Sequence, residues 1–211
     1  MNTVLEKIST FKYLPITKID EIDDVKKIIN ILLKANFPIL EITFRTEYAI
    51  KAIKLASENF PEVLIGAGTI LNIHQAKEAI KAGAKFVVSP GFDTGVVKCC
   101  LKNNIIAIPG INTPTELQQA INLGIKVCKF FPAETSGGLN YLDAMTAPFD
   151  DKVKFIATGG INKDNILKYL QNNRIIACGG SWIINNEILK TKNFGKIAEN
   201  VYELRKIIGL L

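Results

Sequence analysis

A short apolar run followed by a turn and an amphipathic helical segment is the pattern that most limits how this chain can fold. The pattern occurs eight times, roughly every two dozen residues, a spacing typical of consecutive strand–helix units. The apolar runs are Tyr13–Thr17, Phe37–Phe44, Val63–Gly66, Phe86–Ser89, Ile105–Pro109, Val127–Phe131, Lys154–Thr158 and Arg174–Cys178. Eight such units without a linker predict a single domain over residues 1–211, a compact (β/α)8 TIM barrel with a short N-terminal helix over residues 1–10.

A doubly wound open sheet is the alternative fold. Such a sheet usually carries a glycine-rich dinucleotide loop after its first strand, and the segment Tyr13–Asp20 contains no glycine. A chain of 211 residues is near the lower size limit of a closed barrel, but the missing loop favours the barrel.

Polar residues and glycines mark where the helices are expected to begin and end. Thr113, Pro114 and Glu116 combine a capping box with a proline in the first helical turn. Further candidate N-caps are Thr46, Asn72, Asp93 and Asn162. Gly83 and Gly124 each stand just before a strand and predict helix ends.

The charge and the distribution of apolar residues indicate which classes of molecule this protein can bind. The chain has 26 basic and 20 acidic residues, and its formal charge of +6 suits an anionic small substrate or a nucleic acid. The lysines are scattered along helical segments without interleaved aromatics, so no nucleic-acid partner is expected. No apolar stretch could span a bilayer and no signal peptide is recognisable, which predicts no membrane partner and a cytoplasmic location.

The cysteines and the histidine do not suggest a metal site. The four cysteines include no C-x-x-C pair, and the single histidine, His74, stands in the first turn of an expected helix. We therefore expect no metal ion, no other cofactor, and cysteines that remain reduced thiols.

A lysine in the middle of an apolar run is the first candidate for chemistry. Lys129 lies within Val127–Phe131, and the run ends at Pro132. Burial of an ammonium group favours the neutral amine, which attacks carbonyl carbons, so Lys129 is a candidate for a Schiff base with a keto acid. The alternative is a lysine that reaches solvent from a strand end.

Polar residues alternate along the second apolar run. Strand geometry places Glu41, Thr43 and Arg45 on one face, while their apolar neighbours face the helices. The polar face then points into the barrel, where a carboxylate and a guanidinium indicate a reactive site. A purely structural Glu–Arg ion pair is the alternative.

Glycines follow several strands at the end of a barrel where active sites lie. Gly66-Ala67-Gly68-Thr69 permits close approach of the backbone and offers the Thr69 hydroxyl. Two Gly-Gly pairs follow the last two strands, in Thr158-Gly159-Gly160 and Gly179-Gly180-Ser181, and free backbone N–H groups there suit a phosphate. Pro109-Gly110 is typical of an ordinary turn.

Together these groups describe a class I aldolase. Lys129 would form an iminium that accepts electrons as a carbon–carbon bond breaks, and Glu41 would transfer the protons. Arg45 would bind the substrate carboxylate, and the Gly-Gly loops would bind a phosphate at the far end of the substrate.

The same residues resemble the bacterial 2-keto-3-deoxy-6-phosphogluconate (KDPG) and 4-hydroxy-2-oxoglutarate aldolases along nearly the whole chain. The matching motifs are Leu40–Thr46, Gly66–Thr69, Ser89–Gly91, Pro109-Gly110, Lys129–Glu134, Thr158–Ile161 and Gly179–Trp182. The resemblance implies a homotrimeric barrel that cleaves phosphorylated KDPG to pyruvate and glyceraldehyde 3-phosphate, and that also acts on 4-hydroxy-2-oxoglutarate.

The resemblance also implies a role for each site residue. Lys129 would form the Schiff base and Glu41 would act as the general acid and base. Arg45 and Thr69 would bind the pyruvate carboxylate, and Thr158 would line the pyruvate pocket. Near the phosphate would lie Gly160, Gly180 and Ser181.

One position departs from some relatives, which carry an arginine where this chain has Thr17. Arg45 would then be the only basic group for the carboxylate. Two enzymatic alternatives remain: an aldolase for the galactonate epimer, and a sugar-phosphate isomerase or epimerase with Glu41 as its base. A phosphometabolite- or RNA-binding barrel without activity is a third.

Overall fold

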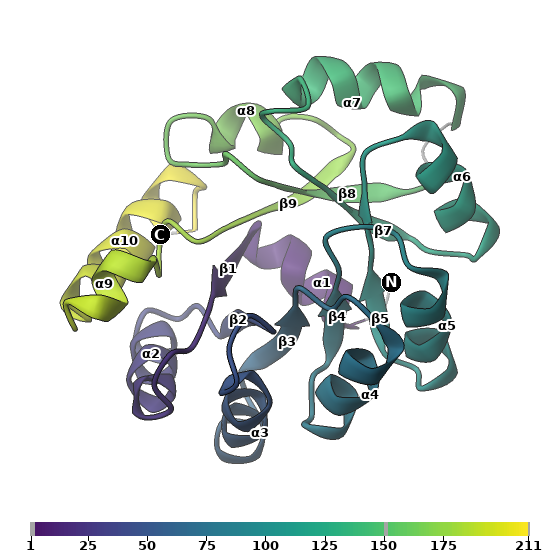
Figure 1. Cartoon of the computed structure of the whole chain (residues 1–211). Helices are drawn as coiled ribbons and strands as arrows, with labels where there is room; N and C mark the ends of the chain where they lie inside the picture. Colours follow the sequence, from purple (N-terminus) through teal and green to yellow (C-terminus); the bar gives the residue numbers. More distant parts are fainter. Residues whose placement is uncertain (1–2, 150–151, 211) are drawn as a thin grey trace.

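The computed structural model describes residues 3–149 and 152–210, in which an inner ring of strands is surrounded by helices (Figure 1). All neighbouring strands pair in parallel, in the order β5-β4-β3-β2-β1-β9-β8-β7-β6. Their bounds are β1 (Tyr13–Thr17), β2 (Ile39–Thr43), β3 (Leu64–Gly68), β4 (Phe86–Val88), β5 (Ile106–Ile108), β6 (Gly110–Ile111), β7 (Val127–Phe130), β8 (Lys154–Thr158) and β9 (Ile175–Gly180).

The ring closes because β5 and β6 are two halves of one bent segment, separated by Pro109. β5 pairs with β4 and β6 pairs with β7, and the Pro109 carbonyl accepts a hydrogen bond from the Lys129 N–H (2.8 Å). Gly110 is needed at the bend, since a Cβ there would lie 2.2 Å from the Pro90 carbonyl oxygen. The expectation of an ordinary turn at Pro109-Gly110 was therefore wrong, whereas the predicted (β/α)8 barrel is confirmed.

Except for the first helix, the helices come after strands along the chain and lie on the outside of the ring, whereas the first helix precedes β1 and is seen in the middle of the ring (Figure 1). Their bounds are α1 (Thr3–Phe11), α2 (Asp23–Lys34), α3 (Ala49–Asn59), α4 (Ile73–Lys81), α5 (Thr94–Lys102), α6 (Pro114–Asn122), α7 (Gly138–Thr146), α8 (Ile166–Leu170), α9 (Asn186–Lys190) and α10 (Gly195–Ile207), with a 3₁₀ turn at Ala147–Phe149. Helix α1 packs against β1 and β9 through its buried residues Leu5 and Ile8, which confirms the expected N-terminal helix within the described residues. No helix in the ranges 3–149 and 152–210 has both the length and the apolar character to cross a membrane.

The side chains of each strand alternate between the barrel interior and the layer under the helices. The Phe86 ring fills the interior beside Gly66, where a Cβ would lie 2.1 Å from the ring. On the other face, the Phe130 ring stacks on Tyr141 of α7 with centroids 6.3 Å apart. Strands covered on both faces read as continuous apolar runs, which is why the runs were recognisable in the sequence.

Three of the five predicted N-caps are confirmed. A side-chain oxygen of Asn72, Asp93 and Thr113 accepts a hydrogen bond from the N–H three residues later, at 2.9, 2.7 and 3.3 Å. Gly83 and Gly124 follow helix ends with φ angles of 101° and 74°, conformations that favour glycine.

The other two predicted caps were wrong because a turn separates each of them from its helix. Helix α3 begins at Ala49, and the Thr46 hydroxyl donates instead to the Ile19 carbonyl (2.5 Å). Helix α8 begins at Ile166, and the Asn162 side chain accepts a hydrogen bond from the Asp164 N–H within the preceding turn.

Candidate active site

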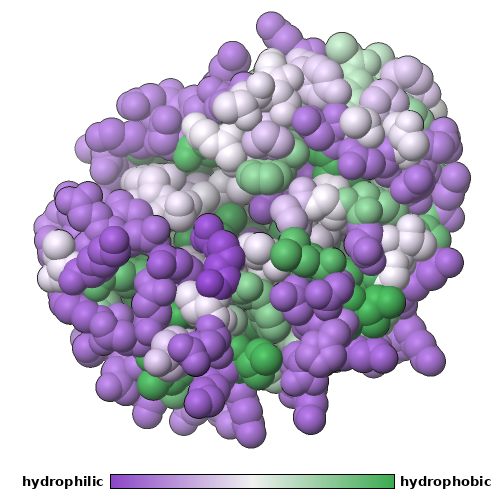
Figure 2. Space-filling view, in the orientation of Figure 1, coloured by the Kyte–Doolittle hydropathy of each residue, from purple (hydrophilic) through white to green (hydrophobic). Residues whose placement is uncertain are grey.

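The C-terminal ends of the strands surround a cavity of about 440 Å³. Figure 2 shows one face of the molecule in the orientation of Figure 1. Hydrophilic residues predominate at the periphery of this face, and apolar and intermediate residues lie nearer its centre. The cavity brings together all the predicted site residues: Glu41, Arg45, Thr69, Lys129, Thr158, Gly160, Gly180 and Ser181. It is also lined by Ile16, Thr43, Pro90, Phe131, Gly159, Ile161, Gly179 and Trp182.

Lys129 is buried at the floor of this cavity, where β7 pairs with β6 and β8. Its side chain is 9% exposed and its Nζ lies 4.6 Å from the centroid of the Phe131 ring. Burial lowers the pKa of Lys129 below that of a free lysine, the Glu41 carboxylate opposes this effect, and the Arg45 guanidinium adds to it. The low exposure does not fit a lysine that reaches bulk solvent, and the lowered pKa increases the share of neutral, nucleophilic amine relative to a free lysine.

Glu41 is buried on β2 and faces the same cavity. It is 1% exposed, and burial raises the pKa of its carboxyl group, an effect that the charges of Lys129 and Arg45 oppose. Gly68 on β3 makes room for this side chain, because a Cβ at Gly68 would lie 1.9 Å from Glu41 Oε1. A raised pKa leaves a larger share of the carboxyl group protonated than in a free glutamic acid, which suits a group that donates protons as well as accepting them.

Arg45 lies at the exposed rim just beyond the end of β2. Its Nε donates a hydrogen bond to Thr43 Oγ1 (3.2 Å), and the Thr43 hydroxyl donates to the Thr17 carbonyl of β1 (3.2 Å). In the described part of the chain no salt bridge joins Arg45 to Glu41, so the structural ion pair considered above is not supported. The two guanidinium NH₂ groups remain available to an anionic ligand.

Thr69 adopts a backbone conformation that is unusual for a β-branched residue. Its φ is +57°, in the left-handed region, and it follows directly after β3 at the cavity wall. Such strained residues are concentrated at functional sites, where the surrounding structure holds them in place. The hydrogen bond from the Ile70 N–H to the Val88 carbonyl (3.1 Å) fixes the chain on the far side of Thr69.

The loops after β8 and β9 form the other side of the cavity. Gly159 and Gly160 have φ angles of 98° and 83°, and the side chain of Thr158 is buried with its hydroxyl close to Gly179. Gly160 and Ser181 are exposed to the cavity, where their backbone N–H groups and the serine hydroxyl are available to an anion.

Two residues that position these loops were not assigned a role from the sequence. Glu134 packs against Gly160, where a Cβ would lie 2.7 Å from that of Glu134, and its backbone N–H donates to the Gly159 carbonyl (3.0 Å). The Glu134 carboxylate accepts a hydrogen bond from the Tyr169 hydroxyl of α8. Glu134 stands in the quoted motif after Lys129, but Tyr169 is far away in the sequence and carries no local signal.

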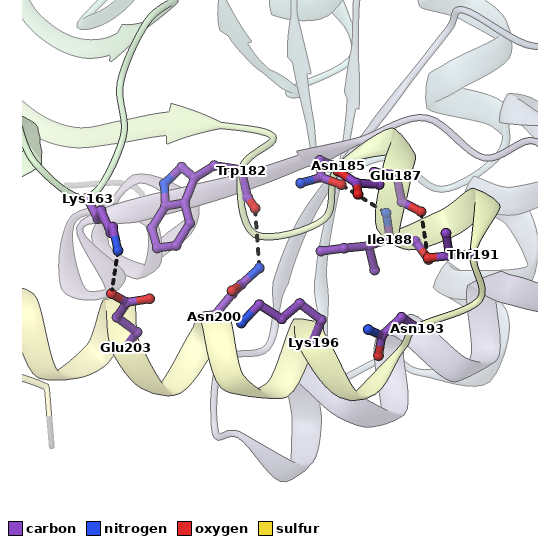
Figure 3. Close-up of a pocket in the computed structure, with 10 residues that line it drawn as sticks. All are labelled: Lys163, Trp182, Asn185, Glu187, Ile188, Thr191, Asn193, Lys196, Asn200 and Glu203. Carbon is purple, nitrogen blue, oxygen red and sulfur yellow. Dashed lines mark hydrogen bonds and ion pairs between the residues drawn. The ribbon is translucent and has the colours of Figure 1, made fainter.

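A second cavity, of about 430 Å³, lies behind the loop after β9 (Figure 3). It shares Trp182 with the first cavity, and its other walls come from the loop before α8, from α9 and from α10. Several of its lining residues are ion-paired or hydrogen-bonded to one another, as Figure 3 shows for Lys163 and Glu203 (3.3 Å) and for the Asn200 amide and the Trp182 carbonyl.

The cysteines take no part in the site. Cys128 lies under the helices, and burial raises its pKa, with a further contribution from the Glu116 carboxylate of α6. Burial also raises the pKa of Cys100 to about 12. Among residues 3–149 and 152–210, no group of three or more His, Cys, Asp or Glu side chains could hold a metal ion.

Comparison with known proteins gives consistent matches over nearly the whole chain. The family model described as "KDPG and KHG aldolase" matches residues 4–200. The 2-dehydro-3-deoxy-phosphogluconate aldolase of Treponema pallidum is 36% identical over 100% of this chain and 100% of its own length.

Two solved structures are similar in both sequence and fold. A KDPG aldolase from Legionella pneumophila, with pyruvate captured as a covalent carbinolamine intermediate, has a TM-score of 0.90 and 35% identity, covering 95% of this chain and 97% of its own. The aldolase of Zymomonas mobilis with 3-phosphoglycerate has a TM-score of 0.88 and 33% identity, covering 97% and 95%.

Proposed function

The chain belongs to the KDPG and KHG aldolase family, and from this premise we propose a role for each residue of its cavity. It is a class I aldolase that cleaves 2-dehydro-3-deoxy-6-phosphogluconate to pyruvate and glyceraldehyde 3-phosphate. The observation that carries the assignment of roles is a buried lysine, with its pKa lowered by burial, in the same cavity as a buried carboxyl group.

Lys129 is the nucleophile. Its neutral Nζ attacks the C2 carbonyl of the substrate and gives a carbinolamine, which loses water to form an iminium. The carbinolamine captured in the Legionella pneumophila relative supports this order of steps. The cavity excludes bulk water from the amine, since only 9% of Lys129 is exposed.

Glu41 carries the protons between these intermediates. Its protonated form donates to the departing carbinolamine hydroxyl, and the resulting carboxylate takes the proton of the C4 hydroxyl as the C3–C4 bond breaks. Glyceraldehyde 3-phosphate leaves, and the electron pair of the broken bond remains as an enamine on Lys129. Glu41 then returns its proton to C3, and water hydrolyses the iminium to release pyruvate and the free amine.

Arg45 and Thr69 bind the carboxylate next to the reacting carbonyl. The Arg45 guanidinium is held at the rim by Thr43, and the Thr69 hydroxyl lies on the adjacent strand end. A bidentate contact from Arg45 would fix the carbonyl in position for attack by Lys129.

The phosphate lies at the opposite side of the cavity, against the backbone of Gly160 and Gly180 and the hydroxyl of Ser181. Thr158 stands between the two ends and lines the pyruvate pocket. The support for this placement is that both Gly-Gly loops open onto the same cavity as Lys129, and that a similar enzyme has been solved with 3-phosphoglycerate.

Three broader features complete the proposal. Residues 1–211 form one aldolase domain, of which the family model matches 4–200. The protein acts as a homotrimer, and the exposed apolar residues Leu71 (57%) and Ile73 (44%) are candidates for the subunit contact. The mass of the native protein in solution tests the trimer. The proposed location is the cytoplasm, in agreement with the four free thiols.

Reductive trapping tests the roles within the cavity. Pyruvate and borohydride should add one stable adduct to the wild-type enzyme at Lys129, whereas a sugar-phosphate isomerase would gain none. Lys129→Ala should lose both the adduct and KDPG cleavage, while the matched control Lys126→Ala, an exposed lysine of the same segment, should keep both. Glu41→Gln should slow cleavage by on the order of 10²–10⁴. A trapped adduct on another lysine would refute the assignment.

Substrate comparison tests specificity. We propose KDPG as the principal substrate and 4-hydroxy-2-oxoglutarate, which gives pyruvate and glyoxylate, as a second one. Measured kcat/KM values with these two substrates and with the galactonate epimer would settle the order. A larger value for the galactonate epimer would contradict the proposal.

A further inference from the structure

Asn200 is a polar residue on the buried face of α10. It is 7% exposed, and Ile197, Val201 and Leu204 on the same helix are fully buried. A buried amide is unfavourable unless it is hydrogen-bonded. The Asn200 Nδ2 donates to the backbone carbonyls of Trp182 (3.3 Å) and Ile183 (3.2 Å), and Figure 3 shows the side chain pointing from the helix toward that loop.

These two carbonyls belong to the segment that leaves β9. Gly180 and Ser181 come immediately before them, and the chain from Ser181 to Ile184 has no regular secondary structure. Trp182 separates the active-site cavity from the cavity drawn in Figure 3. Because no strand pairing fixes this stretch, its position depends on contacts from outside the barrel, and Asn200 supplies two of them.

A second contact joins α10 to the other Gly-Gly loop. Lys163, which follows Gly160 and Ile161, forms an ion pair with Glu203 at 3.3 Å. Both side chains are about half exposed, at 53% and 44%, so solvent screens the pair and its effect on loop position is small. Glu203 lies about one helical turn after Asn200 and lines the same cavity, which makes it a matched control.

We propose that Asn200 is a positioning residue for the phosphate end of the substrate. The pairing of β9 with β1 already fixes Gly180, and the Asn200 amide holds the backbone that follows Ser181, so that the N–H and hydroxyl groups of Ser181 keep the geometry that a phosphate requires. The inference rests on the proposed placement of the phosphate at these residues. Helix α10 does not line the active-site cavity. Through Asn200 it would nevertheless affect the preference of the enzyme for phosphorylated over unphosphorylated substrates.

The test compares two substrates in two variants. Asn200→Asp keeps the shape but removes the donor amide, and Asn200→Leu keeps a similar volume without polar atoms. The KM for KDPG should rise by roughly three- to tenfold, the loss expected from one or two buried hydrogen bonds. The KM for 4-hydroxy-2-oxoglutarate, which has no phosphate, should change less than twofold, and Glu203→Gln should resemble wild type with both.

A second measurement probes the phosphate end directly. Inorganic phosphate should inhibit cleavage of 4-hydroxy-2-oxoglutarate competitively, and its inhibition constant should rise in the Asn200 variants by the same factor as the KM for KDPG. A merely structural role would lower the melting temperature and affect both substrates equally, and that result would overturn the inference. If wild-type enzyme cleaved neither substrate, the proposed function itself would fail.

Discussion

Substitution of Gly68 by alanine should displace the carboxylate of Glu41, the proposed acid and base, without changing any side chain that has a proposed role in the reaction. The added Cβ would lie 1.9 Å from Glu41 Oε1 and 2.6 Å from its carboxyl carbon, whereas ordinary contacts begin at 3.4 Å. The carboxylate oxygen must therefore move by about 1.5 Å. Glu41 is 1% exposed, so the displaced group cannot swing into solvent and has to shift within the cavity.

The size of the effect follows from the geometry of proton transfer. A misplacement of about 1 Å commonly costs on the order of 10² in rate, so kcat for KDPG cleavage should fall by at least about 10², or roughly 2.7 kcal/mol in the barrier. The extra methyl group should also lower the free energy of unfolding by about 1–3 kcal/mol through overpacking. The loss of rate should exceed what a small fraction of unfolded protein can explain.

A coupled assay for pyruvate, with thermal unfolding of the same samples, measures both effects. Gly66→Ala is the matched control for crowding on the same strand: Gly66 pairs with Glu41 across β2 and β3, but the atoms nearest to its added Cβ, at 2.1 Å, belong to the Phe86 ring and not to Glu41. Gly91→Ala, with no atom within 4 Å of its Cβ, should be silent. Gly68→Ala should still give the borohydride adduct with pyruvate, since Lys129 is unchanged. A kcat within about threefold of wild type for Gly68→Ala would refute the argument that the position of Glu41 matters.

The remaining predictions concern the charges of Glu41 and Arg45, and the Thr43 hydroxyl that holds Arg45. Because the Glu41 carboxylate raises the pKa of Lys129, Glu41→Gln should lower that pKa further. The acid limb of the pH profile for the rate of reductive trapping should then move to lower pH. Arg45→Ala should move the same limb to higher pH, since the guanidinium lowers the pKa of Lys129; shifts of equal sign in the two variants would contradict this coupling. Thr43→Val should raise the KM for pyruvate in the aldol direction by roughly two- to tenfold, because Arg45 loses its hydrogen-bond partner, and Thr43→Ser should restore it. An unchanged KM in Thr43→Val would show that the guanidinium is positioned by other means.

Much of the candidate site could be predicted because the alternation of side chains along a strand decides which residues face the barrel interior. A strand alternates its side chains, so Glu41, Thr43 and Lys129 had to share the barrel interior once their runs were recognised as strands. The same rule places Cys128 on the opposite face, under the helices, where burial raises the pKa of its thiol. The motifs around these residues also carry the resemblance to the aldolase family.

Local signals were less reliable where the chain turns. Thr46 and Asn162 have the right chemistry for helix caps, but each is used by a turn that precedes its helix. Pro109-Gly110 has the composition of a turn, yet it lies within the bent strand that closes the ring. In these cases several conformations suit the same residues, and contacts with distant parts of the chain select one of them.

The sequence by itself determined the strand–helix alternation, the inward face of each strand and the place of Lys129 on such a face, because these depend on neighbouring residues and on backbone geometry. The tertiary structure alone decided which distant groups meet: the Glu134 carboxylate with Tyr169, and Asn200 with the carbonyl of Trp182. It also decided the pKa directions of Lys129 and Glu41, since burial is a property of the closed barrel and not of either strand.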